Sequence, residues 1–441
     1  MEISSTTTEY DRLIARHHAM RLRRQILAPA QSFPTAPVGA SAGHLAGTGT
    51  AGGYGDGGYG DGGYGSGGHD AAADQRTIRD GLGPVTPFAG LIDHLYAFMF
   101  RRRPYLRALF PDSMEFQQAH LERMFDHLIE NLHDPVRLSA TLNRLGRDHR
   151  KLGVRPVHYE AFEEALREAL RHRAGSRWNA DVEGAWVRML RFAVRSMVDG
   201  AESALTEPPY WHATVVGHER RRPDLAVLRV RTGEPYPYRA GQYGTVEHPM
   251  LPHTWRQYSM GCAPRADNEL EFHVRRTGPG GVSEALVEHT AVGARLRLGP
   301  PRGTLMPEDG TRDLLLVAGG TGLAPMKAIV GELVEHRPRG RRVHLFVGAR
   351  ARADLYDWPA LAELGGRKPW LELIPVPDDA AGGPAGVGGR LAEAVSRAGD
   401  WSEHLACVSG PAGLVDEVRA RLAASGLPAA RIHHDPVLGR F

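Results

Sequence analysis

The 441-residue chain is too long for one hydrophobic core, and a usual domain size of about 100–200 residues predicts three folded units. No apolar run reaches the roughly 18–20 residues that a membrane-spanning helix needs, and the N-terminus lacks the apolar stretch of a signal peptide. We therefore expect a cytoplasmic protein. The only cysteines, Cys262 and Cys407, exclude a disulfide framework and cannot supply the four ligands of an ordinary iron–sulfur cluster.

The net charge is small, at +3. The basic residues are almost all arginines, and they are interspersed with Asp and Glu rather than gathered in one stripe. A nucleic-acid partner is therefore not expected.

Residues 1–75 do not resemble part of a core. Within them, 51–68 repeat Gly-Gly-Tyr-Gly-Asp/Ser three times, and glycine loses so much entropy on ordering that such a stretch is predicted to be a disordered tail. Self-association through the regularly spaced tyrosines is the alternative function for this segment.

From 76 to 205 the apolar residues recur at helical spacing, which predicts an all-α domain. Pro104 and Gly153 mark breaks, and Pro156 stands where a helix can begin. The stripes include Ile92, Leu95, Tyr96 and Met99, then Phe116, His120, Met124, Leu128 and Leu132, then Leu138, Leu142, Leu145 and His149.

The pattern changes after Pro208-Pro209. Short β-rich runs punctuated by Gly and Pro over 208–306 predict a small antiparallel barrel. Over 310–441, apolar strands alternate with helical segments, which is typical of a parallel α/β sheet. The expected fold class is therefore multidomain: all-α, then an antiparallel β-barrel, then an α/β domain with a parallel sheet.

The barrel carries the most specific motif of the chain. In Arg256-Gln257-Tyr258-Ser259, the Arg can neutralise a pyrophosphate, the Tyr ring can cover a flavin face, and the Ser hydroxyl can reach the flavin nitrogen that accepts hydride. A Gly-Gly-x-Ser turn opening a helix presents backbone N–H groups to phosphate oxygens. The accompanying motifs are Arg239-Ala240-Gly241-Gln242-Tyr243 upstream and Gly280-Gly281-Val282-Ser283 downstream.

The α/β region opens with a glycine-rich turn between a buried strand and a helix. Glycines there let the backbone approach a dinucleotide pyrophosphate, and the helix N-terminus adds favourable partial charge. The residues that we assign to this nucleotide site are Gly320, Thr321, Gly322 and Pro325.

Together these motifs resemble the ferredoxin-reductase-like superfamily, which pairs an FAD barrel with an NAD(P)-binding α/β domain. Ser409-Gly410-Pro411 resembles the second nucleotide-contacting turn of that family, which usually begins with Cys. The cysteine count leaves no iron–sulfur module to receive electrons, so the helical domain is the remaining candidate. It resembles a globin, and the three domains in this order resemble the flavohaemoglobins over about 76–441.

The resemblance implies roles for several residues of the helical domain. His149 matches the proximal haem ligand, because the run from Asp148 to Tyr159 resembles the proximal run of the family. Tyr159 matches a tyrosine that orients this ligand. Phe110 matches the phenylalanine that wedges the haem, and Tyr96 matches the distal tyrosine whose hydroxyl donates to oxygen in the pocket.

Several positions depart from the family pattern. His120 stands where a distal Gln is usual, and it can bond the ligand, bind iron itself or do neither. Asp148 replaces a Lys beside the proximal ligand, which reverses a charge near the haem. The proximal glutamate would fall at or next to Ala201, and Glu202 is its candidate substitute. Phe441 is the candidate for the aromatic residue that covers the flavin.

The resemblance implies an NAD(P)H-dependent oxidoreductase containing haem b and FAD that converts O2 and nitric oxide to nitrate. Two alternatives stay open: haem-linked reduction of peroxide, lipid or ferric ion, favoured by the proximal departures, and a sensor of oxygen or redox state that uses the tail for interaction. Arg350 and Arg352 can meet a 2′-phosphate, but the choice between NADH and NADPH stays open, as does that between monomer and dimer.

Overall fold

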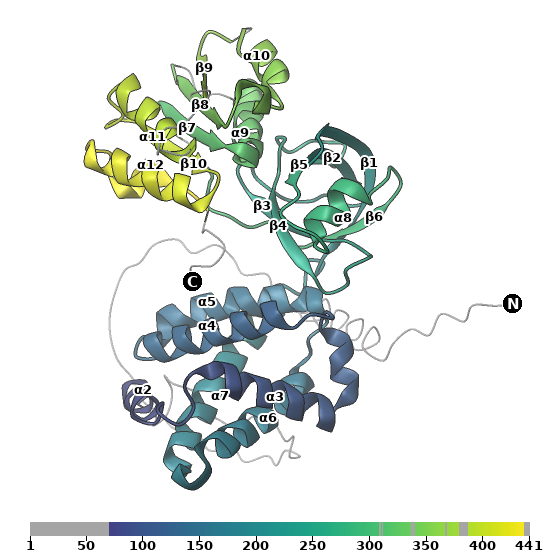
Figure 1. The fold of residues 1–441 in the computed structure, drawn as a ribbon, viewed down its shortest axis with the longest axis vertical. Helices are drawn as coiled ribbons and strands as arrows, with labels where there is room; N and C mark the ends of the chain where they lie inside the picture. The colour runs from purple at the N-terminus through teal and green to yellow at the C-terminus, as the bar shows by residue number, and fades with distance from the viewer. Residues whose placement is uncertain are drawn as a thin grey trace, which may run out of the picture. The chain divides into compact units, whose positions relative to one another are not determined.

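The computed structural model describes residues 70–307, 310, 312–336, 340–366, 368–378 and 387–435 (Figure 1). The Gly/Tyr repeat and Phe441 lie outside the described residues. The expected class is confirmed: a helical domain comes first, an antiparallel sheet second and a parallel sheet third. No helix of the described residues is long and apolar enough to cross a membrane.

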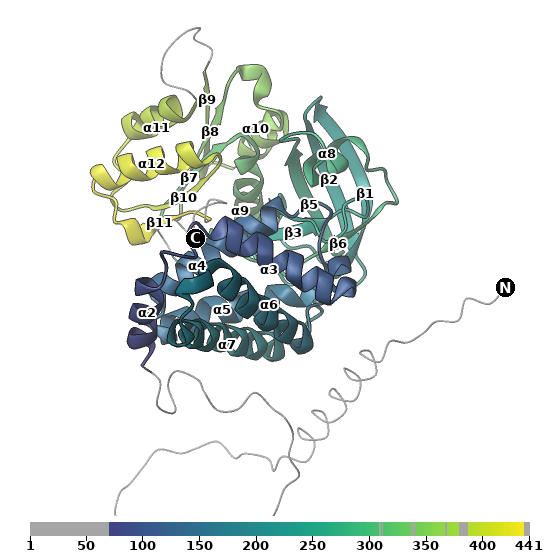
Figure 2. The ribbon, with the colours of Figure 1, turned by 60° about the horizontal axis from the view of Figure 1, so that its bottom comes forward.

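The helical domain has a core of buried Leu, Ile, Phe and Trp side chains, including Trp186, which is fully buried. Figure 2 shows the helices packed around this core, with α5 against α7 and α3 against α6. Its elements are α2 (Ala71–Asp80), α3 (Phe88–Arg102), η1 (Pro104–Leu109), α4 (Glu115–Asn131), α5 (Pro135–His149), η2 (Arg150–Leu152), α6 (Pro156–Ala174), η3 (Gly175–Arg177) and α7 (Ala180–Ser203).

The expected boundary between tail and helical domain, placed after residue 75, needs correction. Helix α2 begins at Ala71, because the Asp70 carboxylate accepts from the Ala72 N–H and caps the helix. Two of its residues are tied into the domain: Asp74 pairs with Arg188 at 2.6 Å, and the Gln75 amide donates to the Ile129 carbonyl at 2.7 Å. Residues 71–75 therefore belong to the folded domain.

Two glycines set how closely α5 approaches α7. A Cβ at Gly146 would lie 1.8 Å from the Met197 carbonyl oxygen, and a Cβ at Gly200 would lie 2.1 Å from that of Asn143. Only glycine permits these contacts. Helix α5 ends at His149, the 3-10 turn η2 continues to Leu152, and Gly153 at φ +73° closes the segment.

The six-stranded antiparallel sheet has the order β4-β3-β6-β1-β2-β5, and α8 (Val282–Glu288) follows β5. Its inward side chains, among them Val215, Leu228 and Phe272, form a separate core. The strands are β1 (Trp211–Arg222), β2 (Leu225–Thr232), β3 (Tyr243–Glu247), β4 (Trp255–Ser259), β5 (Glu269–Arg275) and β6 (Arg295–Leu298).

The five-stranded parallel sheet has the order β11-β10-β7-β8-β9. Its central strand β7 is buried along its whole length, which explains its uninterrupted apolar sequence. Its elements are β7 (Leu314–Gly319), η4 (Gly320–Gly322), α9 (Leu323–His336), β8 (Val343–Ala349), η5 (Arg352–Asp354), α10 (Trp358–Gly366), β9 (Leu371–Pro377), α11 (Val387–Ala398), β10 (Leu405–Ser409), α12 (Ala412–Ala424), η6 (Ala429–Arg431) and β11 (Ile432–His433).

Candidate functional site

The imidazole of His149 is held by its own helix. Its Nδ1 lies 2.9 Å from the Leu145 carbonyl oxygen, and because a carbonyl only accepts, Nδ1 carries the proton. Burial lowers the pKa of His149, which favours the neutral ring. A neutral imidazole with Nδ1–H engaged offers Nε2 as a ligand, so the residue fits the axial position of a haem iron.

Tyr96 lies in a cluster of aromatic rings contributed by α3 and the end of η1. Its ring is 5.8 Å from that of Phe100 and 5.6 Å from that of Phe110. Burial raises the pKa of Tyr96, so the hydroxyl stays protonated and can donate. Its hydroxyl has no hydrogen-bond partner within the described parts of the chain, which leaves the donor for a ligand.

His120 lies on α4, with its ring stacked on Phe116 at 6.0 Å and 5°. Burial, the nearby His149 imidazole and Arg123 together lower the pKa of His120. Whether His120 bonds a ligand, binds iron or does neither stays open.

Within the described residues, no hydrogen bond joins Tyr159 or Glu202 to His149, whose imidazole bonds the Leu145 carbonyl. Tyr159 is half-buried in the helical core on α6, and burial raises its pKa to about 12. Glu202, in contrast, is exposed on α7. The role of Glu202 in a relay with Tyr159 and His149 stays a prediction, and the exposure of its side chain argues against it.

The flavin motif lies on two paired strands. Tyr243 on β3 lies opposite Ser259 on β4, and Gly244 lies opposite Tyr258. Burial raises the pKa of Tyr243 to about 12 and raises that of Tyr258 as well, so both present neutral phenols. Gln257, on the same strand, is half-buried.

Arg256 projects from β4 to the ring of Phe116, with its guanidinium carbon 5.2 Å from the ring centroid. One of its N–H groups donates to the neighbouring Trp255 carbonyl at 3.0 Å. No carboxylate is paired with it among the described residues, so the cation suits a ligand pyrophosphate.

The second flavin motif forms the turn before α8. Gly280 adopts φ +71°, and its N–H donates at 2.6 Å to the Glu284 carboxylate. Gly281 caps the helix, Val282 is buried, and the Ser283 hydroxyl accepts from the Thr277 N–H at 3.1 Å. The Gly280 N–H is thus bonded to a carboxylate of the chain itself, and phosphate binding at this turn stays a prediction.

The two nucleotide turns lie side by side. Because β7 and β10 are parallel neighbours, with Ala318 opposite Ser409, their carboxyl ends meet at one edge of the sheet. A Cβ at Gly322 would lie 2.3 Å from the Ser409 carbonyl oxygen, so glycine is required there. The other assigned residues surround this contact: Gly320 at φ +58°, Thr321 in η4, Pro325 buried in α9, Gly410 at φ +153°, and Pro411 capping α12.

The sequence did not reveal the contacts on either side of His149. The Asp148 carboxylate accepts from Arg302 at 3.1 Å, and Lys151 donates to the Thr245 hydroxyl at 3.1 Å. Lys151 also lies 5.2 Å from the Trp255 ring centroid. The sequence feature that could have pointed to these contacts is Lys151 itself, because lysine is rare in this chain. Only three of the 54 Lys and Arg residues are lysines.

Three family models match the chain in order. A globin model matches residues 93–197, an oxidoreductase FAD-binding domain model matches 212–306, and an oxidoreductase NAD-binding domain model matches 316–420. Each falls on the domain that carries the corresponding motif.

Relatives of two kinds are found. A flavohemoprotein from Rhizobium meliloti is 28% identical over 377 residues, covering 78% of this chain and 92% of that protein. The ferredoxin–NAD(P)+ reductase component of the naphthalene 1,2-dioxygenase/salicylate 5-hydroxylase systems of a Ralstonia species is 33% identical over 230 residues, 50% of this chain and 67% of that protein. The chain spans about half to two thirds of the reductase components that it matches.

The crystal structure of flavohemoglobin from Malassezia yamatoensis with bound FAD and heme has the same fold, with a TM-score of 0.66 at 18% identity. The match covers 82% of this chain and 98% of that one. The chain therefore combines a globin domain with FAD-binding and NAD-binding oxidoreductase domains in this order, and flavohemoproteins are similar to it over most of its length.

Proposed function

We propose that this protein is a nitric oxide dioxygenase that oxidises NAD(P)H and converts nitric oxide and O2 to nitrate. Two molecules each of nitric oxide and O2 accept the two electrons of one NAD(P)H, giving two nitrate ions, NAD(P)+ and one proton. Support comes from the similarity to flavohemoproteins, from the His149 imidazole and from the Tyr96 hydroxyl. The protein's substrates would thus be small molecules that reach the haem pocket.

The haem would supply an iron that binds diatomic ligands, and FAD would convert a hydride into single electrons. The chain's own residues position and protect these groups. The Leu145 carbonyl fixes the orientation of the His149 ring and leaves Nε2 as the atom that would bind iron. On the distal side, the Tyr96 hydroxyl would donate toward a bound ligand that gains negative charge, and the neighbouring Phe100 and Phe110 rings would exclude water.

The reductase residues hold the dinucleotides. Arg256 and the turn at 280–283 would neutralise the FAD pyrophosphate, while the neutral phenols of Tyr243 and Tyr258 would border the flavin ring. The adjoining turns at Gly322 and Ser409 would hold NAD(P)H at the sheet edge. Each role is carried over from the motif and stays part of the proposal.

The observation that carries the proposal is the His149 imidazole, with Nδ1 engaged and Nε2 left as a ligand. The test is an absorption spectrum of the purified protein, oxidised and then mixed anaerobically with NADH or NADPH. We expect a haem band with flavin shoulders that shifts on reduction, followed by stoichiometric nitrate when O2 and nitric oxide are added.

His149→Ala should keep flavin reduction but lose both the haem band and nitrate formation. His133→Ala, which changes another histidine of the helical domain, is the matched control and should lose neither. A wild-type protein that binds FAD but takes up no haem would overturn the proposal.

The exposure of Glu202 favours a second candidate, haem-linked reduction of peroxide, lipid or ferric ion. Without a carboxylate in the relay, the proximal imidazole donates less electron density to iron, which weakens oxygen activation. NAD(P)H oxidation that depends on His149 and is driven by a hydroperoxide or ferric salt, without nitrate formation under nitric oxide, would select this candidate.

A further inference from the structure

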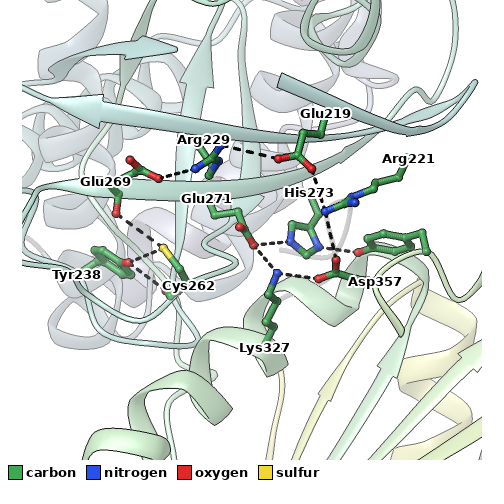
Figure 3. A network of polar contacts seen from close by, with 11 residues as sticks. Glu219, Arg221, Arg229, Tyr238, Cys262, Glu269, Glu271, His273, Lys327 and Asp357 are labelled. Carbon is green, nitrogen blue, oxygen red and sulfur yellow. Dashed lines mark hydrogen bonds and ion pairs between the residues drawn. The ribbon is translucent and has the colours of Figure 1, made fainter. Parts of the chain in front are cut away.

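A buried polar network joins the antiparallel sheet to the parallel-sheet domain (Figure 3). The Lys327 ammonium donates to the Glu271 carboxylate at 2.9 Å and to the Asp357 carboxylate at 2.7 Å. Its side chain is 24% exposed, that of Glu271 is 16% exposed and that of Asp357 only 2%. We call these three residues the Lys327 bridge.

Two further side chains fix the position of Glu271. His273 is fully buried, with Nε2 2.8 Å from the Glu271 carboxylate and Nδ1 2.6 Å from the Tyr356 hydroxyl. Because a carboxylate only accepts, the Nε2–H of His273 donates to Glu271, while Nδ1 and the Tyr356 hydroxyl lie within hydrogen-bond distance of each other. Burial raises the pKa of Tyr356, which keeps its hydroxyl a donor.

The bridge is ionised. Burial opposes the charge on Lys327, but the Glu271 and Asp357 carboxylates outweigh it and raise the pKa of Lys327. Burial likewise opposes the charge on Glu271, but hydrogen bonds from His273 and Lys327 lower the pKa of Glu271 to about 2. The ammonium is therefore held between two carboxylates in a largely buried site, where such contacts are directional and costly to break.

The members of the bridge come from elements that border both dinucleotide sites. Glu271 lies on β5 of the antiparallel sheet, which contacts η4, the turn at Gly320–Gly322. Lys327 lies in α9, the helix that this turn opens. Asp357 lies between η5 and α10, in the segment that follows β8. The bridge thus fixes the nucleotide turn against the sheet that carries the flavin motif.

The lysine is itself informative. Only three of the 54 basic residues are lysines, and a compact ammonium with three donors can approach two carboxylates from different elements. Each partner lies outside the motifs that the sequence singled out, so no nucleotide-binding role accounts for them.

We propose that Lys327 is a positioning residue for hydride transfer from NAD(P)H to FAD. In this step a hydride, two electrons with one proton, leaves the nicotinamide and joins the flavin, and Lys327 neither gains nor loses a proton. The donor and acceptor atoms must come within about 3–3.5 Å, and a misplacement of about 1 Å can cost about a hundredfold in rate. The inference needs only the flavin and nucleotide domains and is independent of nitric oxide chemistry.

The test compares Lys327→Met with wild type in the full-length, FAD-loaded protein by anaerobic stopped flow. With saturating NADH or NADPH, whichever the wild type prefers, we expect flavin reduction to slow by about tenfold or more. The deuterium isotope effect with 4-deuterated nucleotide should rise, while nucleotide affinity and reduction by dithionite stay within about twofold. Lys368→Met, a lysine outside the bridge, is the matched control and should behave as wild type.

Two more variants separate positioning from folding. Lys327→Arg keeps the charge and should recover part of the rate, whereas the double variant Lys327→Met/Glu271→Gln should be no slower than Lys327→Met alone. If Lys327→Met fails to bind FAD, Glu271→Gln should show the same slowing and the same rise in isotope effect. Wild-type reduction rates and isotope effects in folded Lys327→Met, even with a lowered melting temperature, would overturn the proposal.

Discussion

The Asp148 carboxylate accepts a hydrogen bond from the Arg302 guanidinium at 3.1 Å, and this contact joins the residue before His149 to the end of the flavin-binding domain. By the resemblance, Asp148 stands where a Lys is usual, so a charge would be reversed beside the proposed proximal ligand. Arg302 and Lys151 lie 3.1 and 3.6 Å from the same oxygen of the Asp148 carboxylate, so two cations offset its negative charge.

Arg302→Gln should therefore slow electron transfer between the domains more than it affects stability. The pair is partly exposed, so its loss should cost no more than about 1 kcal/mol of unfolding free energy. Because the contact fixes the segment that carries His149, haem reduction by NAD(P)H should slow several-fold while flavin reduction is unchanged. Anaerobic stopped flow at haem and flavin wavelengths measures both.

The control for that experiment is Arg312→Gln, which removes a guanidinium 3.3 Å from the exposed Glu403 carboxylate. It should leave both rates unchanged. Equal rates of haem reduction in Arg302→Gln and Arg312→Gln would show that the contact with Asp148 does not matter for electron transfer.

Tyr96→Phe should weaken oxygen binding without unfolding the domain. The ring keeps its packing against Phe100 and Phe110, but the hydroxyl that can donate into the pocket is lost. A hydrogen bond to a charged partner contributes about 1.5–3 kcal/mol, so O2 should dissociate about tenfold to a hundredfold faster. Flash photolysis measures this rate, with Tyr105→Phe, which alters an exposed ring, as the control.

The order and class of the domains could be predicted because helical and strand periodicities and the glycine turns are local in sequence. The position of the proximal glutamate could not be predicted, because a shift of one residue along a helix turns the side chain by about 100°. Ala201 is half-buried and Glu202 is exposed, so the neighbour of the expected position points away. The Lys327 bridge joins residues 56 and 30 positions apart, which only the tertiary structure brings together.

The start of the helical domain was missed for a different reason. The glycine-rich composition ends at 68, and a boundary drawn from composition alone cannot detect one capping residue. Asp70 begins α2 through a single side-chain hydrogen bond to the Ala72 N–H, which the spacing of apolar residues does not report.

Gly322→Ala should impair use of NAD(P)H. The added methyl group would lie 2.3 Å from the Ser409 carbonyl oxygen, so the two nucleotide turns must separate. We expect the KM for NAD(P)H to rise by about tenfold or more, since a displaced turn loses its backbone contacts to the pyrophosphate. Steady-state reduction of ferricyanide, which takes electrons from flavin directly, measures it.

Gly331→Ala is the matched control, because its methyl group would meet Ala263 at an ordinary 3.6 Å in the middle of α9. It should stabilise the protein by about 0.5–1 kcal/mol and leave the KM unchanged. A Gly322→Ala variant with the wild-type KM would argue against a nucleotide site at this turn.

Asp435 should make stability fall as the pH rises from about 4 to 6. Burial raises the pKa of its carboxyl to about 6, although the Thr304 N–H, at 3.0 Å, favours the charged form. The unfolded carboxyl titrates near its ordinary value of about 3.9. Between these two values the folded state binds more protons than the unfolded state, so its advantage is present at low pH and is lost as the pH rises through 6.

Asp435→Asn removes this titration. The difference in unfolding free energy between wild type and variant should therefore change between pH 4 and 6, with the wild type relatively less stable at the higher pH, and stay constant above about pH 7. Urea unfolding at a series of pH values measures this difference, and other titrating groups cancel because both proteins share them. A wild-type-minus-Asp435→Asn difference that is independent of pH would refute the raised pKa.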